Sequence, residues 1–251
     1  MGRLIKICSV LLALVLLTAC ATSGGNGPIV DSQELRLTAD SDKIVIFAQG
    51  APFGFWARND QGNGPPFNCV FSQGNAVVGD GTLTLSLTQS GNGFAGAEYR
   101  SWERFSYGFY SVSMKAAACS GVISSFFTYC GYPWDEIDIE FLGNDTTKVQ
   151  FNYYTRGAGN HEYIYDLGFD ASADYHEYAF DWQPDSITWY VDGKPVYKAT
   201  DNIPSSPGNI MMNIWNVADS TGDWAGKLDV NGLPVYAQYQ WIGYRSAKND
   251  A

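Results

Sequence analysis

The chain has 251 residues, of which 45% are hydrophobic and 16% are charged, and this balance predicts a globular protein of one ordinary domain or two small ones. Its 26 acidic and 15 basic residues give a formal net charge of −11, which excludes the basic surface that nucleic-acid binding requires. Many glycines and aromatic residues favour strands and turns, and an acidic protein rich in Trp and Tyr suits a neutral ligand with flat apolar faces, such as a sugar.

The N-terminal residues resemble an export signal. Two basic residues precede the apolar stretch 7–17, which is shorter than the roughly 20 residues of a membrane-spanning helix. Residues 17–20 read Leu-Thr-Ala-Cys and resemble the bacterial lipobox, so we predict a lipoprotein signal peptide over residues 1–19 and lipid attachment at Cys20. The alternative is an ordinary signal peptide that is cut after Ala19 or a little later. Both interpretations predict an exported protein, either a cell-surface or outer-membrane lipoprotein or a secreted one.

The next segment, residues 20–34, is rich in small and polar residues and is typical of a flexible tether. No other linker follows, so we predict one domain over residues 35–248. This domain contains Cys69, Cys119 and Cys130, an odd number that allows one disulfide at most. Cys119 and Cys130 are expected at opposite ends of one extended segment, too far apart to pair.

Short strand patterns separated by Gly, Asn and Asp turns fill the predicted domain. Residues 82–88 alternate Thr or Ser with Leu, so the leucines should face a core. The Asp192-Gly193 pair between two strand patterns predicts a hairpin. We predict further strands over residues 107–115, 122–129, 148–155, 177–182, 186–191, 210–215 and 236–244. About a dozen strands without helical periodicity indicate an all-β sandwich or jelly roll, whose curved sheet could offer a groove to a polymer.

The most informative stretch is residues 134–143, in which acidic and aliphatic residues alternate with the period of a strand. Glu136, Asp138 and Glu140 should therefore share one face, where like charges raise one another's pKa. A solvated edge strand is the alternative, but such strands favour Lys and mixed charges. We interpret the three acids as a carboxylate pair for glycoside cleavage, assisted by a third.

The spacing of the two glutamates permits this chemistry. Retaining glycosidases need two carboxyl groups about 5–5.5 Å apart. The Cα atoms of Glu136 and Glu140 should lie about 13 Å apart in a strand. Two long Glu side chains that lean towards each other across a concave strand can close that gap. Asp138 is short enough not to obstruct them, and it would help to keep one Glu protonated near neutral pH.

The segment Glu136-Ile-Asp-Ile-Glu140 resembles the signature of glycoside hydrolase family sixteen, and the chain is similar to the bacterial lichenases of that family, the endo-1,3-1,4-β-glucanases, over roughly residues 53–244. The resemblance implies a jelly roll of two stacked antiparallel sheets with a concave substrate cleft. It also implies retaining hydrolysis of mixed-linkage β-glucan, with Glu136 as nucleophile, Glu140 as general acid/base and Asp138 as the assisting carboxylate. The further similar segments are residues 134–144, 146–155, 167–172, 178–184 and 210–216.

Two alternatives to this function stay open. Family members specialised for 1,3-linked glucan typically carry an extra residue before the last Glu of the signature, and its absence here favours the mixed linkage over a laminarinase. A surface lectin that only binds glucan would not need a paired acid and nucleophile. We expect no cofactor for catalysis, β-glucan as the partner, a monomer, and membrane contact only through the N-terminal lipid.

The resemblance also implies a set of substrate contacts. Glu98 and Arg100 match residues that hydrogen-bond sugar hydroxyls, although a surface salt bridge between them is the alternative. For any single aromatic match the alternative is core packing, which is least expected for the two tryptophans of the Gly/Asp-rich region, Trp215 and Trp224. The remaining matches are Asn63, Phe127, Tyr129, Trp134, Tyr154 and Asn213.

The chain departs from the family at two structural positions. The usual disulfide partner of Cys69 would be residue 96, which is Gly here, so Cys69 is either free or bonded to Cys130. Many members hold a structural calcium through backbone carbonyls and an Asp before the C-terminal Trp. Gly81 matches one of these metal ligands, but the Asp position is Gln240, whose neutral amide oxygen binds a hard cation less well.

Overall fold

The computed structural model describes residues 43–221 and 223–247, which belong to one compact unit, Glu34–Ala251. The predicted signal peptide, the lipidation site Cys20 and the predicted tether lie outside the described residues. The described part is almost entirely β-structure. Twelve of its sixteen strands follow one another along a hydrogen-bonded path, β1 to β4 pair with strands of that path, and short 3₁₀ helices lie at Phe47–Gln49, Gln73–Asn75, Asp219–Thr221 and Val230–Gly232. None of the described residues forms a helix with the length and apolar character needed to cross a bilayer.

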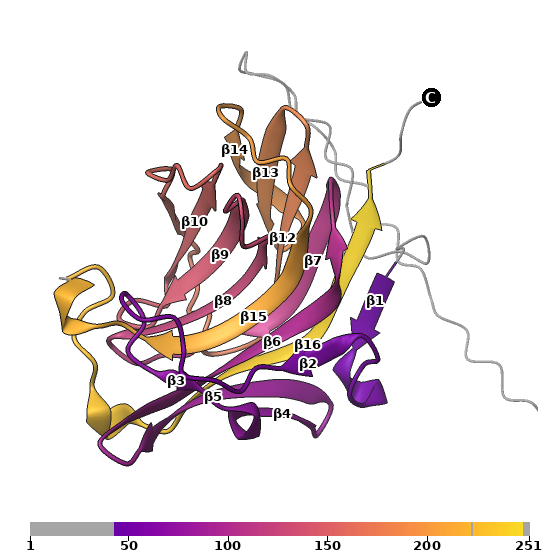
Figure 1. Cartoon of the computed structure of the whole chain (residues 1–251). Helices are drawn as coiled ribbons and strands as arrows, with labels where there is room; N and C mark the ends of the chain where they lie inside the picture. Colours follow the sequence, from indigo (N-terminus) through magenta and orange to yellow (C-terminus); the bar gives the residue numbers. More distant parts are fainter. Residues whose placement is uncertain (1–42, 222, 248–251) are drawn as a thin grey trace, which may run out of the picture. The chain divides into compact units, whose positions relative to one another are not determined.

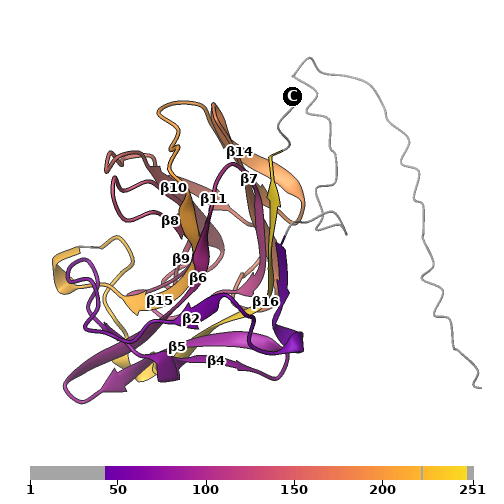
Figure 2. The same ribbon diagram turned by 45° about the vertical axis from the view of Figure 1, so that its right-hand side comes forward.

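The strands form two layers, which we name the front sheet and the back sheet (Figures 1 and 2). Neighbours in the front sheet follow the order β11–β10–β9–β8–β15–β6–β2. These strands span Tyr163–Asp166 (β11), Lys148–Tyr154 (β10), Glu136–Leu142 (β9), Val122–Tyr129 (β8), Gly208–Asn216 (β15), Gly93–Phe105 (β6) and Phe55–Ala57 (β2). The strands of this sheet bend together along their length (Figure 1).

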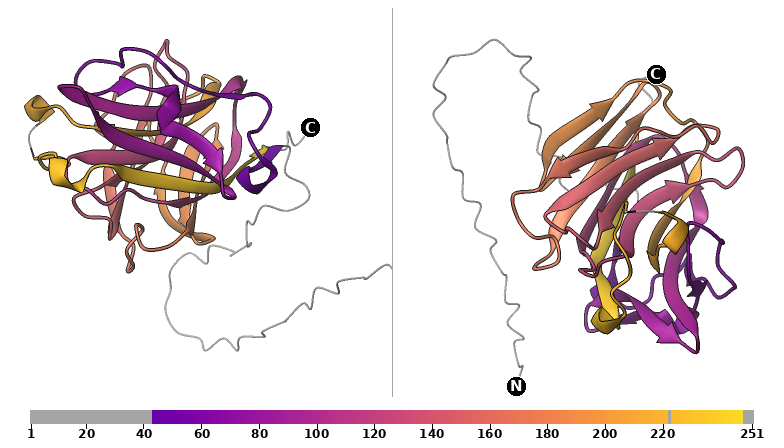
Figure 3. Two further views of the ribbon diagram at one scale, coloured as in Figure 1. Left: turned by 90° about the horizontal axis from the view of Figure 1, so that it is seen from below. Right: turned by 90° about the vertical axis from the view of Figure 1, so that its left-hand side faces the viewer.

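Neighbours in the back sheet follow the order β4–β5–β16–β7–β12–β13–β14, with β1 also paired to β16. The strands span Ala76–Gly79 (β4), Thr82–Ser90 (β5), Val235–Ser246 (β16), Gly108–Lys115 (β7), His176–Gln183 (β12), Ser186–Val191 (β13), Lys194–Ala199 (β14) and Lys43–Ile46 (β1). The two layers are joined where the end of β5 pairs with the start of β6, and the short β3 (Val70–Phe71) adds a parallel pair on β6. Figure 3 gives two further views of the same strands.

The core lies between the sheets. On β5, the three leucines of the predicted alternation are fully buried. On β9, the aliphatic face points to the back sheet, where the ring of Phe141 contacts that of Tyr178 with centroids 4.8 Å apart. Trp189 of β13 donates its Nε1–H to the backbone oxygen of Asp138 at 3.1 Å. The back of β9 is therefore packed and hydrogen-bonded, and its acidic face is turned away from the core.

The all-β sandwich predicted from the sequence is confirmed, and each predicted strand corresponds to an observed one. The predicted hairpin is the β13–β14 turn, in which Asp192 and Gly193 have φ angles of +48° and +75°. Two positive φ angles in a row match the twist of the flanking strands, which explains the Asp-Gly sequence. The short strands β1 to β4 and β11 have too few residues to show a clear alternation.

The three cysteines of the described part are free and buried, so the alternative of a Cys69–Cys130 bond is wrong. Cys119 and Cys130 lie just before and just after β8, at opposite ends of an extended segment as predicted. Residue 96 does lie beside Cys69: a Cβ atom on Gly96 would stand 3.0 Å from the Cys69 Sγ and only 2.4 Å from the backbone oxygen of Ile214.

Candidate active site

The three acids of β9 lie in the middle of the front sheet, between β8 and β10. Both neighbours pair with β9 in a continuous antiparallel register without a bulge. Directly opposite residues of adjacent strands share one face of a sheet, so each acid has one neighbour on either side. These neighbours are Tyr129 and Tyr154 for Glu136, Phe127 and Asn152 for Asp138, and Ser125 and Gln150 for Glu140.

Glu136 is partly exposed and receives two hydrogen bonds. The indole Nε1–H of Trp134 donates to Glu136 Oε2 at 2.7 Å, and the Trp134 ring stacks on Tyr154 with centroids 4.9 Å apart. The second hydrogen bond joins the carboxyl groups of Glu136 and Asp138. Two donors on one carboxylate favour its charged form, which a nucleophile needs.

Glu140 has a different environment. Its Oε2 atom accepts one hydrogen bond, from Gln150 Nε2 at 2.8 Å. The other end of the same amide, Gln150 Oε1, accepts from Trp224 Nε1 at 3.0 Å. Because an indole nitrogen only donates, Trp224 fixes the orientation of the amide and makes Gln150 a donor to Glu140.

Burial dominates the electrostatics of the three carboxyl groups. It raises the pKa of Glu136 to about 8, a rise increased by the charge of Glu140 and opposed by the hydrogen bonds from Trp134 and Asp138. It raises the pKa of Glu140 to about 7, where the hydrogen bond from Gln150 opposes the rise. Burial and both glutamates raise the pKa of Asp138 well above its ordinary value.

The protons of such a cluster leave in steps that belong to the group rather than to a single residue. The pKa values of about 8 for Glu136 and about 7 for Glu140 would place the first negative charge on Glu140, whereas the hydrogen-bond donors, two on Glu136 and one on Glu140, favour it on Glu136. We assign the charge to Glu136, because protonated Asp138 and the Trp134 indole both donate to it, and the proton to Glu140. A pair consisting of one charged and one protonated Glu on one strand is suited to nucleophilic attack with acid assistance.

A second polar cluster lies across the same face, on β6. Glu98 is buried, with one carboxylate oxygen 3.4 Å from Arg58 Nη1 and the other 3.4 Å from Arg100 Nη1. Arg58 also binds Asp60 through its Nε atom at 2.6 Å. The salt bridge of the alternative is therefore present, but only Arg100 is partly exposed, and its partner Glu98 is buried. Burial raises the pKa of Glu98, and the two guanidinium groups oppose that rise.

Most of the predicted substrate contacts share the face of the acids. Phe127, Tyr129 and Tyr154 flank the acids directly, and Asn213 accepts a hydrogen bond from Ser125 Oγ at 2.5 Å. Asn63 is exposed in the loop after β2. The ion pairs of Arg58 with Asp60 and with Glu98 link this loop to β6.

The expectation that Trp215 lies outside a core is wrong. Its side chain is only 3% exposed and belongs to the buried cluster. Phe67, from a loop after β2, covers it with ring centroids 4.0 Å apart, and Trp224 covers it with centroids 6.1 Å apart. Trp224 itself is partly buried against the core, and only its Nε1–H reaches the acids, through Gln150.

Gln150 and Arg58 are site residues that the sequence reasoning missed. A signal for Gln150 was present: the turn at residues 143–147 between two strand patterns places it opposite Glu140. Arg58 had none, because it precedes an irregular loop and reaches Glu98 over forty positions of sequence.

The described residues fit poorly the structural calcium that the resemblance implies for many family members. Gln240 Oε1 already accepts a hydrogen bond from Ser113 Oγ at 2.9 Å. Gly81, with φ of +83°, contributes only a backbone carbonyl. Within residues 43–221 and 223–247, no group of three or more His, Cys, Asp or Glu side chains is arranged to hold a metal ion.

Comparison with known proteins agrees with this geometry. The model of the family described as glycosyl hydrolases family 16 matches residues 63–241, which is most of the chain. The chain belongs to glycosyl hydrolase family 16. A beta-glucanase of Bacillus subtilis is 54% identical to it over 199 residues, which cover 76% of this chain and 81% of the relative.

Solved structures show the same fold. A beta-1,3-1,4-glucanase (lichenase) from a mouse hindgut metagenome superposes with a TM-score of 0.78 at 49% identity, covering 82% of this chain and 99% of that one. The laminarinase catalytic domain of Thermotoga maritima has a TM-score of 0.72 at 22% identity, covering 83% and 98%. At that identity the likeness concerns the fold alone, whereas the likeness to the lichenase extends to the sequence. This member of glycosyl hydrolase family 16 is therefore a glycoside hydrolase.

Proposed function

We propose that the protein is a retaining endo-1,3-1,4-β-glucanase that hydrolyses mixed-linkage β-glucan by double displacement. The regular register of β9 carries the proposal, because no inserted residue bulges the strand between Glu136 and Glu140. Sequence identity of about half with relatives named as beta-glucanases and a lichenase supports it.

In the first step, the Glu136 carboxylate attacks the anomeric carbon and Glu140 donates its proton to the departing glycosidic oxygen. Asp138 stays protonated and donates to Glu136. In the second step, Glu140, now ionised, takes a proton from water as the water attacks the glycosyl-enzyme bond, and Glu136 leaves as a carboxylate. The same anomeric configuration is restored and Glu140 regains its proton. No cofactor takes part in these steps.

The substrate is tested with a reducing-sugar assay on lichenan, laminarin and carboxymethylcellulose. We expect release of oligosaccharides from lichenan and little from the other two. Faster cleavage of laminarin would favour the laminarinase alternative. Binding of lichenan without release of oligosaccharide would favour the lectin alternative, and inversion of the anomer, followed by NMR, would contradict double displacement.

The roles of the two glutamates are tested by azide rescue. In Glu140→Ala, azide should replace the activated water and release a glycosyl azide with the configuration of the substrate. In Glu136→Ala, azide should attack the substrate directly and give the opposite configuration. Exchanged outcomes would reverse the assignment. Asp166→Asn, an exposed carboxylate at the end of β11, is the matched control and should leave the activity unchanged.

We also propose that the protein is exported and attached to a membrane surface by a lipid on Cys20, and that it works there as a monomer. The lipobox-like sequence at residues 17–20 supports the lipid attachment. Labelling with a fatty acid in the native host should mark the protein, and Cys20→Ser should abolish the label. A labelled Cys20→Ser variant, or an unlabelled parent, would contradict the attachment.

A further inference from the structure

An exposed aromatic pair stands at the β2–β6 edge of the front sheet. The side chain of Phe53 is 90% exposed and that of Trp102 is 60% exposed. Their rings contact each other edge to face, with centroids 5.5 Å apart. Trp56 of β2, which is 39% exposed, lies opposite Arg100, whose guanidinium stands 5.4 Å from the Trp56 ring. Contiguous exposed aromatic surface of this kind typically marks a binding site. We name Phe53, Trp56 and Trp102 the outer platform.

The backbone beneath the outer platform is held firmly. Trp102 N donates to the carbonyl of Gly54 at 2.8 Å, which ties the two aromatic segments together. Between Asn209 and Met211 the register of β15 and β6 shifts, so residues 101–103 of β6 bulge. The Asn209 amide fills this bulge and donates to the backbone oxygens of all three residues, at 2.9, 3.4 and 3.2 Å. The ring of Trp102 is therefore presented by an ordered bulge rather than by a loose loop.

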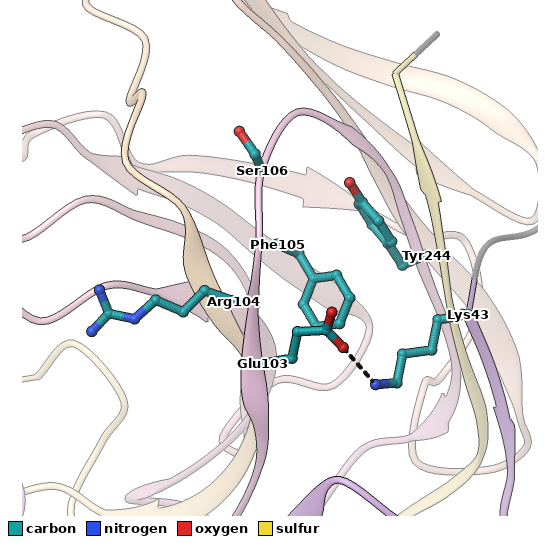
Figure 4. A pocket seen from close by; sticks show the side chains of 6 residues that line it. All are labelled: Lys43, Glu103, Arg104, Phe105, Ser106 and Tyr244. Atoms are coloured by element: carbon teal, nitrogen blue, oxygen red, sulfur yellow. Dashed lines mark hydrogen bonds and ion pairs between the residues drawn. The ribbon is translucent and has the colours of Figure 1, made fainter.

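The neighbouring side chains show which way this part of β6 faces. Glu103 turns towards β1 and pairs with Lys43 at 3.2 Å, next to a cavity of about 440 Å³, whereas Arg104 extends to the opposite side of the strand (Figure 4). The bulge interrupts regular alternation at Trp102, but the residues on either side of it, Arg100 and Arg104, pair with Met211 and Asn209 on the face of the acids. Trp102 therefore lies exposed between two residues of that face. Lys43 and Glu103 both line the cavity, and because they form an ion pair their charges neutralise each other.

The outer platform continues the face of the acids. Cross-strand partners lead from Asp138 to Phe127 on β8, Met211 on β15, Arg100 on β6 and finally Trp56 on β2. From β9 to β6 there are three strand spacings, or roughly 14 Å. A polymer chain that lies across the strands with one bond at the acids would therefore reach the outer platform, whereas a very short oligosaccharide would not.

We propose that the outer platform is a distal binding site for β-glucan chains, which holds the polymer beyond the residues around the acids. Tryptophan and phenylalanine rings stack on the apolar faces of sugars, and their neutrality suits an uncharged polymer on an acidic protein. This inference rests on the proposed function for the identity of the sugar. It assigns a role to three residues that the cleavage chemistry does not use.

The test compares long and short substrates. The double variant Phe53→Ala/Trp102→Ala and the single variant Trp102→Ala are assayed on lichenan polymer and on a short mixed-linkage oligosaccharide. The matched control is Tyr236→Ala, an aromatic residue of similar exposure on β16 of the back sheet. We expect the ratio of kcat/KM on polymer to kcat/KM on oligosaccharide to fall about fivefold or more in the double variant, less in the single variant, and not in the control.

Binding is measured separately by retardation in native gels that contain lichenan, because this readout does not depend on cleavage. The double variant should lose most of the retardation, and circular dichroism should show that it is folded. The inference is overturned if the folded double variant keeps both the parental ratio and the parental retardation. If the parent is retarded through the outer platform but releases no sugar, the proposed function fails and the inference stands.

Discussion

Gln150 sets the proton affinity of Glu140 through a single amide. It is 3% exposed, its oxygen is occupied by Trp224, and its nitrogen therefore donates to the acid. A donor to the charged form of a carboxyl group favours ionisation. Gln150 thus limits the rise of the Glu140 pKa that burial causes, so that the group can lose its proton in the first step and take one up in the second.

We predict that Gln150→Leu moves the basic limb of the pH profile of kcat/KM upward. Without the donor the pKa of Glu140 rises above about 7, so the acid stays protonated to higher pH. Trp224→Phe, which keeps the ring and removes the N–H, should shift the limb less and in the same direction. The profiles are measured on lichenan. A limb that stays in place or moves to lower pH in Gln150→Leu would show that the amide does not act on Glu140.

At the scale of the element, the entry to β9 is fixed by Asp135. Its buried carboxylate accepts backbone hydrogen bonds from Arg156 at 2.7 Å, Ser205 at 3.0 Å and Ser206 at 2.9 Å. Trp134, the preceding residue, has φ of +66°, and its carbonyl accepts from Gly157 N at 2.8 Å. Two separate loops are therefore bound to the residue that precedes the acids, and they hold Trp134 where its indole meets Glu136.

We predict that Asp135→Ala lowers the free energy of unfolding by about 2–4 kcal/mol, because three backbone N–H groups lose a charged acceptor. Urea denaturation measures the loss. The exposed Asp166→Ala should change stability by less than about 0.5 kcal/mol. A loss below about 1 kcal/mol in Asp135→Ala would mean that the loops are held by other contacts.

The Asp135 contribution should also depend on pH. Burial tends to raise the pKa of Asp135, but the three backbone donors outweigh it and the pKa lies below its ordinary value of 3.8. A depressed pKa means stability that is present above the unfolded value and is lost as pH falls through the folded value. The difference in stability between the parent and Asp135→Ala should therefore shrink below about pH 4, measured by urea denaturation at several pH values.

At the scale of the whole molecule, the position at which many family members are expected to bind calcium lies on β16, beside β7. Gln240 stands where many family members have Asp, and its oxygen is bound to Ser113. We propose that calcium contributes little to the stability of this protein. EDTA should leave the Tm unchanged, and Gln240→Asp should introduce a rise of Tm with added calcium, because a carboxylate suits the cation better. A fall of the parental Tm in EDTA would contradict the proposal.

Much of this architecture follows from local patterns in the sequence. Period-two alternation predicted β5 and β9, and the acids of β9 were placed on one face because that face is a consequence of the period alone. What could not be predicted depends on long-range pairing. Three such contacts are those of Arg58 with Glu98, of Asn209 with the bulge of β6, and of Phe67 with Trp215. Each joins segments that are distant in the sequence, and the local sequence of one segment does not indicate the other. Trp215 was misjudged for the same reason, because the residues that bury it come from a distant loop.

The hydrogen bond from Trp189 to the Asp138 carbonyl has a consequence for how the enzyme fails on heating. The acids share one strand with side chains of the core. Residues of the back sheet contact that strand through the Trp189 hydrogen bond and the packing of Tyr178 on Phe141. Local opening of the strand would break the core, so no partly opened and inactive form should precede global unfolding. Residual activity and tryptophan fluorescence, followed along one temperature ramp, should therefore decline together. Activity that disappears well before the fluorescence changes would indicate that the strand can detach alone.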